Sequence, residues 1–359
     1  MGDLSAFVRE TAGRFSTTDI LAALLAAVAL WGIRKAPKGR FFDDPLNRAQ
    51  GLALRGLFAC VVVFCHVSDR LLSEGGFLFP RFELWSALAV SVFFGLSGYG
   101  LMRQTAVDSG YLDGFWKKRL RALRWPYLAV SLLAFVQWCR GDYAMGPRLE
   151  KWLGLVDYGW YFTVLLLFYL AFWFGNRRRE RELGHRLALT VGGVLLVTVL
   201  LAFAGFRRMH FESNGAFVAG LFFGAYRDEG CKFLRVHWGK AVAVACAIAA
   251  IRLSWGLSRW AMAGVRADSF FFLHVFWVAG LAALSMKWQL GNPVLSWLGT
   301  ISYELYLVHG WVIDEIAHWR PEWKGAGCAW TVVLASLLLA WVLHKAVEAC
   351  KSRVHSPSL

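Results

Sequence analysis

Charged residues are scarce in this sequence and cysteine motifs are absent. Only 18% of the 359 residues are Asp, Glu, Lys or Arg, whereas 58% are hydrophobic, and this balance excludes an ordinary soluble domain of this length. The seven cysteines form no CxxC pair, which argues against a zinc site or a disulfide framework. Most of them fall in or beside apolar segments, as small packing residues do. We therefore predict no metal site.

We also expect no cleavable leader, and the sequence shows no obvious linker or internal repeat. The first apolar segment, 20–33, is followed by RKAPKGR and has no small-residue cleavage site, so we expect a retained helix. No low-complexity tract divides the chain, and nothing resembles a soluble catalytic domain at either end. These absences favour a single membrane domain.

Long apolar segments dominate what is present. A membrane-length window identifies about eleven spans, which predicts an all-α, polytopic transmembrane helix bundle. The expected spans are 17–33, 50–69, 84–102, 122–138, 158–175, 187–206, 214–226, 240–257, 269–286, 293–313 and 327–346. The segment 214–226 is short and contains glycine, so a broken or re-entrant helix is the alternative there.

Basic residues outnumber acidic ones, 39 to 24, giving a formal charge of +15. In a soluble protein this excess would suggest nucleic acid, but here the basic clusters lie in alternate connections between apolar segments. These clusters are RKAPKGRFFDDPLNR, the stretch 103–121, NRRRERELGHR and RDEGCKFLRVHWGK. The intervening connections at 70–83 and 140–157 carry nearly balanced charge. The positive-inside rule then predicts an N-terminus outside the membrane and a C-terminus in the cytoplasm. Because topology accounts for the basic residues, we expect no nucleic-acid partner.

Arg55 and His66 lie in one predicted span, within RGLFACVVVFCH. Eleven residues are close to three helical turns, so both side chains project from one face, about 16 Å apart along the axis. An ionisable pair on a membrane helix is costly, which makes chemistry or transport the leading hypothesis. The alternative is a snorkelling arginine with a packing histidine. Asp69 either accepts a hydrogen bond from His66, making it a general base, or is a solvated residue at the outer surface.

Two further motifs suggest binding. Ser97 and Gly98 interrupt the aromatic-rich SVFFGLSGYG, and such small residues let another helix or a ligand approach the backbone. The cluster WKKRLRALRWPY contains Arg119, Arg121 and Arg124, whose guanidinium groups suit phosphate oxygens. Ordinary topogenic charge or lipid headgroup contact is the alternative for this cluster.

A polar stripe occurs late in the chain, within ISYELYLVHG. Ser302, Tyr306 and His309 fall at spacings of four and three residues and share one helix face, which usually turns to the bundle interior. Tyr303 lies beside this stripe. Glu304 lies off it and either pairs with a basic group elsewhere or reaches the cytoplasmic interface.

Five motifs together resemble one family. RGLFACVVVFCH, SVFFGLSGYG, KKRLRALRWPY, YGWYFTVLLLFYL and ISYELYLVHG occur in the order found in the acyltransferase type 3 superfamily of integral membrane proteins, over about Arg48 to Glu348. The resemblance implies a core of about ten helices preceded by an extra one. We accordingly expect an additional helix and basic cytoplasmic loop at 1–47, a membrane acyltransferase domain at 48–350 and a cytoplasmic tail at 351–359.

The resemblance implies an O-acyltransferase, usually an O-acetyltransferase, of the bacterial inner membrane. It would move an acyl group from cytoplasmic acetyl-CoA, or another acyl-CoA, to an extracytoplasmic glycan or lipid-linked saccharide. Such polysaccharide modification in the cell envelope implies contact with membrane lipids and with other envelope polysaccharide proteins.

The family's essential arginine and histidine match Arg55 and His66. Its basic motif matches Arg119, Arg121, Arg124 and Pro126, and its late histidine matches His309. With the patterns above, the expected catalytic residues are His66, Arg55 and Asp69, the donor-binding residues Arg119, Arg121 and Arg124, and the substrate-binding residues Ser97, Tyr303, Tyr306 and His309. Two departures, Ser91 in place of an acidic residue and Glu304 in place of a small one, concern the subfamily and the acceptor.

Two mechanisms and two rival functions stay open at this point. His66 acts either as a general base on the acceptor hydroxyl or as a transient acyl nucleophile. Arg55 binds donor phosphate, stabilises the thioester oxygen or holds helices together. A transporter or flippase of an anionic or acylated substrate would also use buried Arg and His, although carriers more often show repeated halves. A non-catalytic scaffold ranks last because it gives the intramembrane ionisable residues no purpose.

Overall fold

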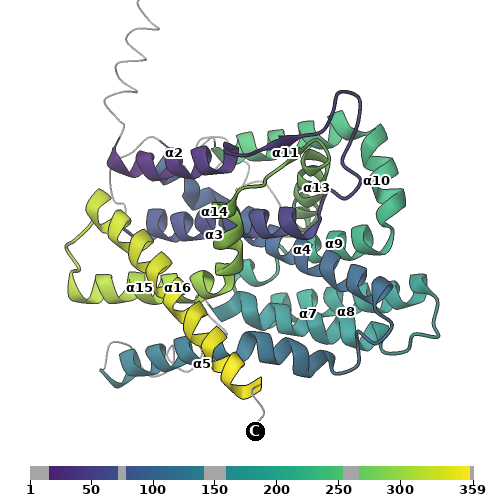
Figure 1. Cartoon of the computed structure of the whole chain (residues 1–359). Coiled ribbons are helices and arrows are strands. Elements are labelled where there is room, and N and C mark those ends of the chain that lie inside the picture. The colour runs from purple at the N-terminus through teal and green to yellow at the C-terminus, as the bar shows by residue number, and fades with distance from the viewer. Residues whose placement is uncertain (1–15, 72–77, 141–158, 254–266, 356–359) are drawn as a thin grey trace, which may run out of the picture.

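The computed structural model describes residues 16–71, 78–140, 159–253 and 267–355. The first 15 residues of the expected N-terminal part and the last four of the expected tail lie outside these ranges, as does most of the connection at 140–157. The described chain is almost entirely helical, which confirms the all-α prediction (Figure 1).

The helices follow one another along the chain with short connections. The first half contains α2 (Thr17–Leu30), α3 (Arg48–Leu71), the 3-10 helix η1 (Phe79–Trp85), α4 (Ser86–Val107), α5 (Phe115–Cys139), α7 (Trp160–Asn176) and α8 (Leu183–Phe203). The second half contains the 3-10 helix η3 (Arg208–His210), α9 (Gly215–Ala225), α10 (Arg227–Val236), α11 (Trp238–Leu253), α13 (Ala267–Ser285), α14 (Pro293–Thr300), α15 (Ser302–Trp319) and α16 (Ala326–His355). Two short strands, β1 (Arg34–Lys35) and β2 (Trp288–Gln289), pair antiparallel.

Several helices are long and apolar enough to cross a membrane. In the described ranges, four candidate spans meet that standard: Arg48–Leu71, Phe79–Val107, Leu183–Phe203 and Ala326–Lys351. A fifth is possible if α10 and α11, which meet at 85°, form one broken span. The expected total of eleven spans is thus not confirmed, because the other expected segments form helices that are shorter or less apolar.

The expected single span at 293–313 is two helices instead. α14 ends at Thr300 and α15 begins at Ser302, and the two run in clearly different directions (Figure 1). The Ser302 hydroxyl donates to the Gly299 carbonyl oxygen at 2.8 Å, which occupies one acceptor at the end of α14. A hydropathy window misses this break because both helices are apolar.

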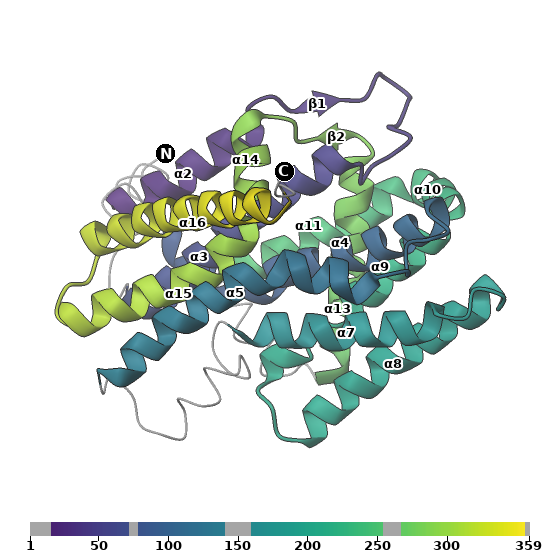
Figure 2. The same ribbon diagram turned by 60° about the horizontal axis from the view of Figure 1, so that its bottom comes forward.

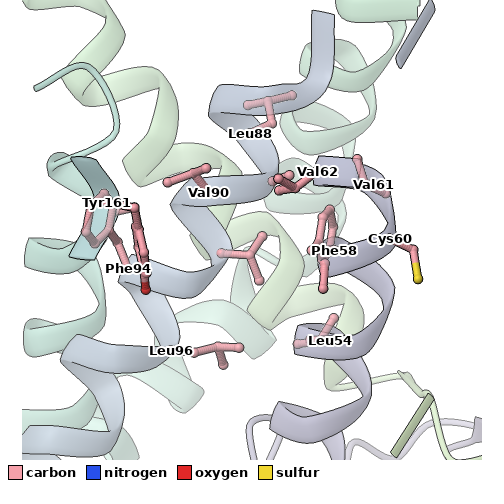
Figure 3. Close-up of a cluster of buried hydrophobic side chains, with 14 of the residues drawn as sticks. Leu54, Phe58, Cys60, Val61, Val62, Leu88, Val90, Phe94, Leu96 and Tyr161 are labelled. Carbon is pink, nitrogen blue, oxygen red and sulfur yellow. The ribbon is translucent and has the colours of Figure 1, made fainter. Parts of the chain in front are cut away.

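α2, α3, α15 and α7 lie close to horizontal in Figure 1, and α3 contacts both α2 and α15. α3 is largely buried and contacts α4, α14, α15, α16 and η1, so it forms the centre of the bundle. Figure 2 shows α15 beside α5 and α16. Apolar side chains of α3, such as Phe58 and Val62, face Leu88 and Val90 of α4 in the core between them (Figure 3).

Glycines bring α4 and α9 unusually close. A Cβ atom on Gly98 would lie 2.3 Å from the Phe217 carbonyl oxygen, and one on Gly220 would lie 2.0 Å from the Gly95 carbonyl oxygen. Only glycine permits this approach. Of the two partners expected for the small residues of SVFFGLSGYG, a helix or a ligand, the one that contacts Gly98 is therefore a helix, α9.

The basic connections gather at one end of the bundle. Arg227 lies 3.8 Å from Asp44, which precedes α3, and Arg235 forms an ion pair with Asp43 at 3.1 Å. Arg179, between α7 and α8, donates to the Asp108 carbonyl oxygen after α4. We call this the basic end. α3 starts there and runs towards the opposite end, so Arg55 lies nearer to the basic end than His66 does.

Candidate functional site

His66 and His309 meet inside the bundle. α3 carries His66 and α15 carries His309, and their imidazole rings stack with centroids 5.2 Å apart and planes inclined by 28°. His309 is fully buried, whereas His66 is partly accessible. The Nδ1 atom of His309 lies 3.0 Å from the Leu305 carbonyl oxygen. Because a carbonyl oxygen only accepts, Nδ1 carries the hydrogen, and in the neutral ring the lone pair is on Nε2.

Tyrosines extend the histidine pair towards the basic end. The Tyr306 ring lies 5.9 Å from that of His309 and 5.3 Å from that of Tyr161 on α7. Tyr161 in turn lies within hydrogen-bonding reach of Ser97 and close enough to Arg55 to interact with it electrostatically. Figure 3 shows Tyr161 packed against Phe94 of α4, with ring centroids 4.8 Å apart.

These side chains form a polar line through an apolar bundle. It includes half of the residues predicted for the site: Arg55, Ser97, Tyr306, His309 and His66. Tyr161 belongs to it but was not singled out in the sequence. Its only signal was a phenol in the aromatic motif YGWYFTVLLLFYL, which does not distinguish it from neighbouring packing aromatics.

Arg55 is half-buried, and its guanidinium group has unused hydrogen-bond donors. Within the described ranges, no hydrogen bond or ion pair holds its guanidinium group. A guanidinium group inside a membrane bundle normally pairs with an acidic group or a carbonyl oxygen. Arg55 is therefore available to bind an anionic or strongly polar group that enters from the basic end.

A polar cavity of about 170 Å³ adjoins the histidine pair on the side away from the basic end. His66 and Tyr306 form part of its wall, together with Trp160. Its charged lining residues are Asp69, Arg70, Arg207 and Glu212. Arg70 is held by Asp314 at 3.0 Å. By volume, the cavity has room for roughly five or six waters or one small polar ring.

Asp69 occupies the exposed part of this cavity. Its carboxylate makes no hydrogen bond with His66, so the solvated alternative describes its position. It lies three residues after His66, but near the end of α3 its side chain points to the surface. The neighbour of the His66 ring is His309 instead, which is distant in sequence.

The three arginines of the basic cluster do not converge. Arg119 lies in an aromatic cage, with its guanidinium carbon 5.3 Å from the centroid of Tyr169 and 5.6 Å from that of Tyr111, whose hydroxyl accepts a hydrogen bond from it. Burial raises the pKa of the Tyr111 phenol, so the phenol stays neutral at pH 7. Arg121 and Arg124 are exposed on another face of α5, and Arg124 stacks over Trp125 at 4.8 Å.

Two residues of the late polar motif lie outside the polar line. The Tyr303 hydroxyl donates to the Leu123 carbonyl oxygen of α5 at 3.3 Å, so this side chain fastens α15 to α5. Glu304 is buried and pairs with His344 of α16 at 2.9 Å, and Glu348 approaches the other ring nitrogen of His344 at 3.3 Å. Of the two alternatives for Glu304, pairing with a basic group is the one observed.

No group of three or more His, Cys, Asp or Glu side chains suited to a metal ion occurs in the described ranges. The polar line is built instead from imidazole, phenol, hydroxyl and guanidinium groups. Such a set can exchange protons and stabilise developing negative charge.

Comparisons with known proteins assign the chain to a family. A family model described as an acyltransferase domain, Acyl_transf_3, matches residues 53–345. Neither the curated proteins nor the solved structures gave a match. The matched range contains Arg55, His66 and His309, and α2 precedes it. The chain is thus an integral membrane protein and belongs to the acyltransferase type 3 family.

Proposed function

We propose that this protein is a membrane O-acyltransferase that moves an acyl group, in the first instance acetyl, from cytoplasmic acyl-CoA to a hydroxyl of an extracytoplasmic glycan or lipid-linked saccharide. The observation that carries the proposal is the stacked pair of His66 and His309 beside a polar cavity. Family membership supports acyl transfer as the reaction class.

The basic end is where the donor would bind. If the basic connections face the cytoplasm of a bacterial inner membrane, as the positive-inside rule favours, the C-terminus is cytoplasmic and Thr17, at the start of α2, faces outward. The exposed Arg121 and Arg124 then meet the CoA phosphates, and the pantetheine arm reaches into the bundle towards Arg55. Because Arg55 lies about 16 Å along α3 from His66, its guanidinium group would bind a polar group of the donor nearer the basic end and not the reacting thioester oxygen.

The cavity beside His66 is where the acceptor hydroxyl would bind. As a general base, His66 takes the hydroxyl proton while the oxygen attacks the thioester carbonyl carbon. The carbon–sulfur bond then breaks and the CoA thiolate leaves and takes up a proton. As a nucleophile, a neutral His66 instead forms an acyl-imidazole by expelling the thiolate, and the acceptor oxygen attacks that intermediate. Both routes need His66 uncharged.

The test uses the purified full-length protein in liposomes, with labelled acetyl-CoA and a panel of saccharide acceptors. His66→Ala and Arg55→Ala are compared with matched controls at exposed positions, His185→Ala and Arg178→Gln. We expect the first two variants to lose transfer by about 100-fold or more and the controls to retain it.

An alternative outcome would reassign the protein. If the parent protein binds no acyl-CoA and moves no acyl group with any donor or acceptor, the polar line serves a carrier, and flux of anionic substrates across the liposome becomes the assay.

A further inference from the structure

Asp19 is a buried carboxylate in α2, the helix that precedes the family domain. Only 2% of its surface is exposed. One oxygen, Oδ1, accepts from the backbone amides of Leu78 and Phe79, each at 2.8 Å. The other, Oδ2, accepts from the Ser16 amide at 3.0 Å and completes a capping box. Three amide donors offset the cost of burying this charge, and two of them belong to the start of η1.

η1 in turn holds the turn of α3 that carries His66. The Cys65 thiol donates to the Phe82 carbonyl oxygen at 2.8 Å, and the Ser68 hydroxyl donates to the Pro80 carbonyl oxygen at 3.0 Å. Cys65 and Ser68 lie on either side of His66 in sequence. Phe64 of the same turn packs against Phe79 and Phe82 of η1, with ring centroids 5.0 and 5.2 Å apart.

We infer that Asp19 is a positioning residue for His66, acting through η1. The inference rests on the proposed function, since the position of His66 affects turnover only if this histidine takes part in the chemistry. The family model matches residues 53–345, so α2 lies before the matched range. On this inference, α2 nevertheless helps to position a residue of the candidate site.

The other end of α2 supplies a matched comparison. The Asn292 side-chain amide donates to the carbonyl oxygens of Val28 at 2.8 Å and Trp31 at 2.9 Å, and its oxygen caps α14 by accepting from the Leu295 amide. Asn292→Ser removes the two bonds to α2 but keeps a capping hydroxyl. Asn292→Ser therefore loosens α2 near the basic end, away from His66.

The experiment measures cysteine alkylation and turnover on the full chain in liposomes. Asp19→Asn keeps one acceptor oxygen for the η1 amides but removes the negative charge and puts an NH2 group where the second acceptor was. The hydrogen bonds that hold η1 are then weaker, so the contact between η1 and α3 should open more often. The readout is the rate at which N-ethylmaleimide labels Cys65 relative to Cys60. Both thiols are buried on α3, and both fall in the tryptic peptide between Arg55 and Arg70. Fragmentation of that peptide separates the two.

We expect Asp19→Asn to raise the Cys65:Cys60 labelling ratio by about fivefold. The same variant should lower kcat by about 10-fold or more, with the KM for the acyl donor unchanged. Asn292→Ser should change neither quantity. An unchanged labelling ratio in Asp19→Asn overturns the inference, and so does an equal increase in Asn292→Ser, which would mean a general loosening of α2. Raised labelling with unaltered kcat overturns the positioning role.

If Asp19→Asn does not accumulate in membranes, Ser68→Ala takes its place, because it removes only the Ser68–Pro80 hydrogen bond. It must then raise Cys65 labelling and lower kcat in the same direction, or the inference fails. Alkylation of Cys65 does not require turnover, so the proposed function and the inference about Asp19 can be contradicted separately. A parent protein that transfers no acyl group overturns the proposed function and with it the catalytic part of this inference, whereas unchanged labelling overturns this inference alone.

Discussion

Gly56 of α3 packs directly against Gly299 of α14. A Cβ atom on Gly56 would lie 2.8 Å from the Gly299 amide nitrogen and 2.3 Å from the Leu295 carbonyl oxygen, and one on Gly299 would lie 2.1 Å from the Leu52 carbonyl oxygen. The two backbones are therefore in contact, with no room for a side chain on either helix. Because Gly56 directly follows Arg55, this crossing fixes the turn of α3 that carries the guanidinium group.

Gly56→Ala should destabilise the protein by about 1–3 kcal/mol, because the new methyl group meets backbone atoms that can yield only if α14 moves. Thermal unfolding in detergent measures the effect. Gly51→Ala is the control, since a Cβ atom there meets nothing within 4 Å on the same helix. It should be neutral or stabilising by about 0.5–1 kcal/mol. Equal melting temperatures for the two variants would contradict the close packing.

His309→Phe tests whether the partner of His66 contributes a nitrogen or only a ring. Phenylalanine keeps an aromatic side chain beside His66 but cannot exchange a proton. We expect kcat to fall by about 100-fold with folding retained, measured at saturating donor and acceptor. His309→Ala should fall at least as far and also lose stability through the cavity it leaves. Full activity in His309→Phe would assign His309 to packing alone.

The pair of Glu304 and His344 joins α15 to α16 inside the bundle. His344→Ala leaves the buried Glu304 carboxylate without this partner and should cost about 3–5 kcal/mol of stability. The double variant Glu304→Gln/His344→Ala should recover part of that loss, since no charge is then buried. Lys345→Ala, one position along on the exposed face, should lie within about 0.5 kcal/mol of the parent protein. Thermal unfolding of the four proteins measures these differences, and a His344→Ala variant as stable as the parent protein would contradict a stabilising role for the pair.

What the sequence predicts well is what depends on helix periodicity. The shared face of Arg55 and His66 and the inward orientation of Tyr306 and His309 follow from spacing along single helices. The stacking of His66 on His309 does not, because 243 residues separate them and only the packing of α3 against α15 brings the rings together. Hydropathy predicts the helical class from every apolar segment, yet it cannot detect the break at Ile301, because the residues on both sides of it are apolar.

The tertiary neighbours of the charged residues do not follow from spacing along the sequence. Asp69 lies at helical spacing from His66 but points to the surface at the end of α3. Arg119 stands in the same basic cluster as Arg121 and Arg124, yet its aromatic cage comes from Tyr111 and Tyr169, which the sequence gives no reason to associate with it. Such tertiary partners depend on how helices pack against one another.

The donor site should therefore depend on two arginines of that cluster and not on the third. Arg121→Gln/Arg124→Gln should raise the KM for acetyl-CoA by about 10-fold without lowering kcat, because both side chains are exposed at the basic end and suit phosphate groups. The effect should shrink as salt rises from low to physiological strength. Arg178→Gln, which removes one exposed positive charge between α7 and α8, is the control and should leave the KM within about twofold. Arg119→Lys should instead lower stability by about 1–2 kcal/mol, since lysine cannot fill the aromatic cage. If the double variant binds acetyl-CoA as the parent protein does, these arginines are topogenic charges and the donor phosphates bind elsewhere.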